Sequence, residues 1–73
     1  ENNTMKTYEN YPFIAELVER ALASTDLTEI AAVLQSISNA MGWYPNHTYE
    51  TACYDAHDEV EEHYHNTEQQ ENK

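Results

Sequence analysis

The sequence predicts an all-α protein, a small antiparallel three-helix bundle. Three segments carry apolar residues at the spacing of a helix face, two short breaks separate them, and no segment alternates as a strand does. The length of 73 residues fits one domain, residues 1–73. We divide it into a polar arm over 1–9, a helical bundle over 10–65 and a polar tail over 66–73. Neither the arm nor the tail has periodic apolar residues, so both are expected to be disordered.

The first helix is predicted over residues 12–23. Asn10 is a suitable N-cap, and Pro12 suits the first turn, where its missing N–H is not needed. The opposite, polar side carries acidic residues, so the segment is amphipathic. The apolar residues that share one face are Phe13, Ile14, Leu17, Val18, Ala21 and Leu22.

The second helix is predicted over residues 27–41. Asp26 followed by Glu29 resembles an acidic capping box at its start. Gly42 is expected to end it as a left-handed C-cap, and Pro45 prevents its continuation. Since Glu29 is its only charged residue, we expect this helix to be the most buried one. Its apolar stripe consists of Leu27, Ile30, Ala31, Leu34, Ile37 and Met41, broadened by Val33 and Ala40.

The third helix is predicted over residues 48–65, with Asn46 or Thr48 as its cap. Trp43 and Tyr44 lie in the connection before it and are expected to fold back over the end of the core. The apolar stripe of this helix is about 120° wide. It consists of Tyr49, Ala52, Cys53, Ala56, Val60 and Tyr64.

The predicted core is small for a chain without a disulfide. We expect the helices to pack through Leu17, Val18, Ile30, Leu34, Ile37, Cys53 and Val60. Such a core leaves little margin of stability, and self-repulsion of like charges reduces that margin further. A homodimer would bury more apolar surface, and a cationic partner would neutralise the charge. Either would add stability, so the sequence indicates protein–protein contact.

The charge balance excludes several classes of function. The chain has 14 acidic and three basic residues, a net charge of −11 and a pI of about 4.4. With only Lys6, Arg20 and Lys73 as bases, direct binding to nucleic acid or to an anionic membrane surface is excluded. No apolar run approaches the ~20 residues of a membrane span. A single cysteine forms no internal disulfide.

For the cysteine and the histidines, a structural role is a better interpretation than catalysis or metal binding. Cys53 lies in an apolar stripe, where an inert thiol is expected. His57, Glu61 and His65 follow one edge of a helix at i, i+4 and i+8, and two of them could chelate a metal. The whole row spans about 12 Å and cannot surround one ion. We therefore predict no enzyme, no metal and no cofactor; a metal- or pH-responsive module that uses these histidines and His63 remains an alternative.

Acidity is concentrated in the second half of the chain. Residues 46–73 hold eight acids and one base, for −7, whereas residues 1–45 hold six acids and two bases, for −4. Such a face either only keeps the protein soluble or imitates a phosphate backbone and occupies a basic groove of a partner. The predicted partner-binding residues are Glu50, Tyr54, Asp55, Asp58, Glu59, Glu61 and Glu62.

In size, acidity, helical pattern and absence of catalytic motifs, the chain resembles small inhibitor proteins of phages and mobile elements. These include DNA-mimic anti-restriction proteins, anti-CRISPR proteins and inhibitors of DNA-repair glycosylases. The resemblance covers most of the chain, rests on no shared motif and transfers no functional residue. It implies a basic nucleic-acid-binding protein as partner, in the cytoplasm of a host cell. The alternative is a small dimeric helical adaptor or structural subunit.

Overall fold

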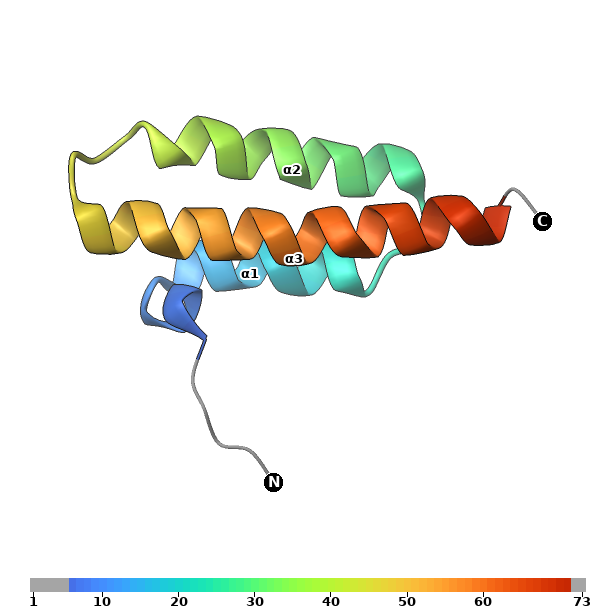
Figure 1. Ribbon diagram of the computed structural model, residues 1–73, viewed down its shortest axis with the longest axis horizontal. Coiled ribbons are helices and arrows are strands. Elements are labelled where there is room, and N and C mark those ends of the chain that lie inside the picture. The colour runs from blue at the N-terminus through green and yellow to red at the C-terminus, as the bar shows by residue number, and fades with distance from the viewer. Residues whose placement is uncertain (1–5, 72–73) are drawn as a thin grey trace, which may run out of the picture.

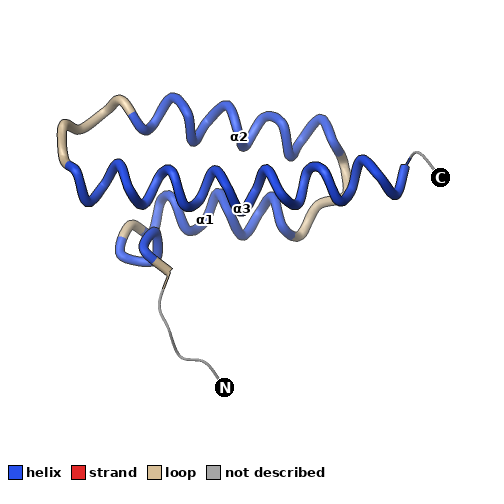
Figure 2. The backbone as a smooth tube through the Cα atoms, viewed as in Figure 1, coloured by secondary structure: helices blue, strands red, loops and turns tan. Residues whose placement is uncertain are grey.

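The computed structural model describes residues 6–71 and contains a short 3₁₀ helix followed by three α-helices. The elements are η1 (Thr7–Asn10), α1 (Pro12–Leu22), α2 (Leu27–Met41) and α3 (His47–Glu71). Successive α-helices run in opposite directions, and α3 lies alongside both of the others (Figure 1). Within residues 6–71 the backbone is helix and connecting loop, without a strand (Figure 2). The predicted all-α three-helix bundle is confirmed.

Helix α1 begins and ends close to the predicted positions. Pro12 is its first residue, as expected. The residue in the N-cap position is Tyr11, which makes no side-chain capping bond, so the prediction of Asn10 as cap is wrong. The reason is that Asn10 belongs to the preceding helix η1.

Helix α2 begins with the predicted acidic cap. The Asp26 carboxylate accepts a hydrogen bond from the backbone N–H of Thr28, at 2.9 Å. Glu29 does not complete a capping box. Its carboxylate accepts a hydrogen bond from the Ser24 hydroxyl at 2.9 Å and lies 4.0 Å from Arg20 Nε. Glu29 thus holds the connection between α1 and α2.

The predicted left-handed cap at Gly42 is wrong. Its φ is −89° and its ψ is 0°. The last turn of α2 tightens instead, because the N–H groups of Gly42 and Trp43 each donate to a carbonyl three residues back. The chain leaves the helix without a residue at positive φ.

Most of the predicted core is confirmed, but three apolar residues of the predicted stripes are exposed. Leu34 packs at the edge of the core, and the other six residues named above for helix packing are buried. Ala31, Phe13 and Leu22 were assigned to apolar stripes and are exposed. Phe13 stacks on Trp43 at one end of the bundle, with ring centroids 5.4 Å apart.

Helix α3, not α2, is the element on which the others converge. It packs against α1, α2 and η1, whereas α2 packs against α1 and α3. The outward side of α2 is uncharged but exposed. Four of the 15 residues of α2 are buried, against four of the 11 residues of α1, so the prediction that α2 is the most buried helix is wrong. The exposed residues of that side are Ala31, Ala32, Gln35, Ser38 and Asn39.

Residues 6–9 and 66–71 are more ordered than predicted. From Lys6 onward the arm packs on the bundle, and the Tyr8 side chain is only 6% exposed. Helix α3 continues to Glu71, and Thr67 is buried. The expected disorder is therefore wrong for residues 6–9 and 66–71. Residues 1–5 and 72–73 lie outside the described residues.

Tyr49, in the first turn of α3, closes one end of the core. Its side chain is 5% exposed, and its hydroxyl donates to the backbone carbonyl of Ala40 at 2.6 Å. Asn46 caps this turn, as predicted, because its Oδ1 accepts from the Tyr49 N–H at 2.9 Å. Burial is the largest cause that raises the pKa of Tyr49, to about 12. The folded state thus disfavours the phenolate.

The conformation of Gly42 predicts that alanine is tolerated there. The nearest atom to an added Cβ is the backbone oxygen of Asn39 at 3.8 Å, an ordinary contact. We expect Gly42→Ala to raise the free energy of unfolding by about 0.5 kcal/mol, because alanine loses less backbone entropy on folding. Urea denaturation followed by circular dichroism measures this. A decrease of about 1 kcal/mol would indicate the left-handed conformation instead.

The pKa of Tyr49 predicts a loss of stability at alkaline pH. A tyrosine in the unfolded chain ionises near pH 10, and folded Tyr49 ionises near pH 12. Between these values the unfolded chain has lost a proton that the folded chain keeps, so the free energy of unfolding falls as pH rises. Urea denaturation across this range should show a steeper fall in the wild type than in Tyr49→Phe. Equal slopes would contradict the assignment.

Candidate functional site

The predicted partner-binding residues lie on α3, outside the buried stripe of that helix. The stripe buries Tyr49, Ala52, Cys53, Ala56 and Val60, so the residues between them point outward. The Tyr54 side chain is 60% exposed. Asp55, Asp58, Glu61 and Glu62 are also exposed, whereas Glu50 and Glu59 are half-buried.

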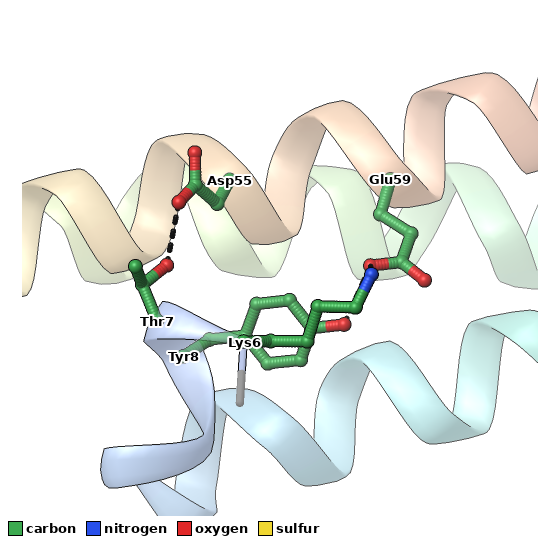
Figure 3. A network of polar contacts seen from close by, with 5 residues as sticks. All are labelled: Lys6, Thr7, Tyr8, Asp55 and Glu59. Carbon is green, nitrogen blue, oxygen red and sulfur yellow. Dashed lines mark hydrogen bonds and ion pairs between the residues drawn. The ribbon is translucent and has the colours of Figure 1, made fainter. Parts of the chain in front are cut away.

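Two of these acids hold the N-terminal segment against α3. The Thr7 hydroxyl donates to Asp55 Oδ2 at 2.6 Å, and the Tyr8 hydroxyl donates to Glu59 Oε1 at 2.5 Å (Figure 3). Lys6 Nζ lies 3.6 Å from the same Glu59 oxygen. Asp55 and Glu59 therefore have partners within the chain that serve the fold.

The Tyr8 phenol is held in its protonated form beside Glu59. Burial raises the pKa of Tyr8, and the hydrogen bond to the Glu59 carboxylate raises it further. The phenol therefore remains a donor through the physiological pH range. Sequence reasoning missed this contact because a single tyrosine in a polar arm produces no periodic signal.

The other outward residues form what we call the outer acidic face: Tyr54, Asp58, Glu61 and Glu62. At 100° per residue they fall within an arc of about 100°. The sequence has no Lys or Arg between Arg20 and Lys73. Within the described residues, Lys6 pairs with Glu59 and Arg20 with Glu29. The outer acidic face therefore has no Lys or Arg partner in the described part of the chain.

Histidines border this face along α3. Glu61 lies 3.7 Å from His57 Nδ1 and 3.9 Å from His65 Nε2, and His65 Nδ1 lies 3.5 Å from Glu68. Each contact is an ion pair only when the imidazole is protonated. The charge of this edge therefore depends on the protonation of His57 and His65.

One group of side chains in the described residues could hold a metal ion. Ligand atoms of His57, Asp58 and Glu61 lie within 4.8 Å of one another. These residues share one helical turn, whereas the predicted row of His57, Glu61 and His65 extends over two. Asp58 and Glu61 are exposed, so water competes for the ion. The absence of a metal stays a prediction.

Cys53 and His63 make contacts that serve the fold. Cys53 is fully buried, and burial raises the pKa of its thiol, which disfavours the nucleophilic thiolate. His63 is one of the histidines of the alternative metal- or pH-responsive module. In the structure its Nε2 lies 2.8 Å from the backbone carbonyl of Ser24, in the connection between α1 and α2.

Aromatic side chains gather at the end of the bundle where α1 and α3 begin. Phe13, Trp43 and Tyr44 are 48%, 54% and 58% exposed. Tyr44 packs edge-on against the core residue Tyr49, as expected, whereas Trp43 stacks on Phe13. A cavity of about 570 Å³ is lined by Tyr11, Tyr44, Pro45, Asn46 and Tyr49. A smaller one of about 280 Å³ lies beside Phe13 and Trp43 and shares the three tyrosines.

Comparison of the chain with protein-family models, with curated proteins and with solved structures gives no match. Among residues 6–71, no helix has both the length and the apolar character needed to cross a membrane.

The division of the acids into two groups predicts different effects on stability. Glu59→Ala removes the acceptor of the Tyr8 hydroxyl, so we expect the free energy of unfolding to fall by about 1 kcal/mol. Glu62→Ala is the matched control and should change it by less than about 0.5 kcal/mol. Thermal denaturation of both variants measures the difference. Equal losses would contradict the division.

Proposed function

We propose that this protein is a non-enzymatic inhibitor that occupies the basic nucleic-acid groove of a host defence or DNA-processing protein. The outer acidic face of α3 would make the contact. The observation that carries the proposal is that Asp58, Glu61 and Glu62 project together without a Lys or Arg neighbour among the described residues. Such a surface attracts a cationic groove and speeds its association.

The charge density of α3 supports imitation of one DNA strand. Its 25 residues extend about 37 Å. One strand of duplex DNA carries about 11 charges over that length. Helix α3 carries eight acidic residues, of which Asp55 and Glu59 are engaged within the chain. The remaining six provide about half the charge of one strand, so we infer a partner that grips a single strand edge.

The residues of the face would have distinct roles. Asp58, Glu61 and Glu62 would pair with Lys or Arg side chains that otherwise contact phosphates. Tyr54 would be an aromatic anchor, since exposed tyrosines often contribute much of the energy of an interface. Glu50, half-buried at the start of α3, would extend the contact. Asp55 and Glu59 would act indirectly, by fixing η1.

We place this action in the cytoplasm of the host cell, where such a partner meets DNA. The homodimer expected from the small core stays a prediction. Two chains joined away from α3 would each keep an outer acidic face, so the proposal holds for one chain or two.

Charge reversal on α3 tests the proposal. The immobilised protein is exposed to host-cell lysate, and retained proteins are eluted with a short DNA duplex. We expect a nucleic-acid-binding protein to be retained by the wild type and released by the duplex. The double variant Asp58→Lys/Glu62→Lys should lose this protein, because two attractions become repulsions.

The matched control is Glu16→Lys/Glu19→Lys, which changes the net charge equally on exposed positions of α1. It should retain the partner, and circular dichroism should show both variants helical. Retention by the α3 variant equal to that of the wild type would contradict the proposal. So would a retained protein that DNA does not release.

A further inference from the structure

A second surface lies at the aromatic end of the bundle, outside the outer acidic face. We call it the aromatic groove and define it by Tyr11, Phe13, Trp43, Tyr44 and Tyr49. Its two cavities, of about 570 and 280 Å³, are neighbours, because Tyr11, Tyr44 and Tyr49 line both. Large exposed aromatic side chains in one place are typical of a binding surface.

The walls of the groove are held in place by packing. Tyr49 is buried and its hydroxyl is bonded to Ala40. The rings of Tyr11 and Tyr44 meet Tyr49 nearly edge-on, with centroids 5.3 and 5.1 Å from its own. Phe13 and Trp43 stack at an interplanar angle of 23°. A ligand therefore meets a surface that is already formed, which lowers the entropic cost of binding.

Several polar groups at the groove can donate hydrogen bonds. Asn46 Oδ1 already accepts from the Tyr49 N–H, which leaves the Asn46 amide NH₂ to donate. The Trp43 indole N–H and the Tyr44 hydroxyl belong to side chains more than half exposed. A ligand that offers flat apolar groups to the rings and carbonyl oxygens to these donors therefore fits the groove.

A proline-rich segment in the polyproline II conformation has this chemistry. Its pyrrolidine rings pack on aromatic side chains, its carbonyls project outward without internal partners, and it is extended before it binds. Neighbouring aromatic pockets are the usual receptors for such segments.

The negative charge of this chain favours basic residues beside the prolines of the ligand. The chain has a net charge of −11, and Lys6 and Arg20, the basic residues described, pair with Glu59 and Glu29. An arginine or lysine beside the prolines would be attracted, and an arginine could also stack on Trp43. At this groove a second copy of this chain would bring another −11 and no complementary charge, so a basic segment is the better match.

We propose that the aromatic groove binds a proline-rich segment of a partner protein that carries a flanking arginine or lysine. This site is independent of the proposed inhibition through α3. It would give the protein a second point of attachment, and two linked contacts hold a partner more tightly than either alone.

Trp43 is the only tryptophan of the chain, so its fluorescence reports on the groove directly. The probe is a synthetic ten-residue peptide of alternating leucines and proline pairs with an arginine at one end. Titration should give a saturable change in the fluorescence. A peptide with every proline replaced by alanine, and one with the arginine replaced by glutamate, should each bind at least about tenfold more weakly.

Tyr44→Ala should weaken binding of the proline–arginine peptide at least about tenfold. Tyr54→Ala is the matched control, since Tyr54 is 60% and Tyr44 58% exposed, and it should leave binding unchanged. Asp58→Lys/Glu62→Lys should also keep the site at physiological salt, so failure of the α3 proposal would be distinguishable from failure here.

Three results would overturn the inference. One is the absence of a saturable fluorescence change, and another is equal binding of the peptide that lacks prolines. The third is sedimentation that shows a dimer which Tyr44→Ala dissociates and Tyr54→Ala does not, because the groove would then be an interface between two copies of this chain.

Discussion

Each of the other helices that the structure describes packs against α3, and much of the buried stripe of α3 is made of small side chains. Ala52, Cys53 and Ala56 are fully buried there. Small residues let α1, α2 and η1 approach the same helix closely, and close contact increases the dispersion energy of a core that has few large side chains. The consequence is that one helix provides the centre of the core and also, on its other side, the most strongly charged surface of the described chain.

The acidic residues of α3 fall into two groups. Asp55 and Glu59 accept hydrogen bonds from Thr7 and Tyr8, so they attach the N-terminal segment to the bundle. The outer acidic face makes no ion pair with a Lys or Arg in the described chain. Because the net charge is −11, the like charges of this face oppose folding. Carboxylates that do not serve the fold are the ones available to a partner. The aromatic groove, at the end of the bundle, is lined by aromatic, proline, asparagine and isoleucine side chains and suits a different chemistry.

The sequence predicted the features that depend on repeated apolar spacing or local cap chemistry, and it did not predict the contacts made by single residues in polar segments. The helices, the Asp26 and Asn46 caps and the core around Ile30, Ile37 and Val60 follow from periodic apolar spacing and cap chemistry, which are local properties. Tyr8 and Thr67 are single residues in polar segments, and only contacts with distant parts of the chain bury them. Phe13 fits the spacing of a core residue, but its place on the first turn of α1 brings it to Trp43 at the end of the bundle. For the site, the acidic positions were predictable, whereas the separation of Asp55 and Glu59 from the others required tertiary structure.

We propose that the outer acidic face opposes folding and serves to bind a partner. The most direct test is the melting temperature of the wild type and of Asp58→Lys/Glu62→Lys as a function of sodium chloride concentration. Salt screens like charges, so the melting temperature of the wild type should rise with salt. The variant should be the more stable of the two at low salt, and the difference should shrink as salt increases. A wild type that is destabilised by salt, or a variant that melts below it at low salt, would mean that these acids stabilise the fold and would contradict the claim.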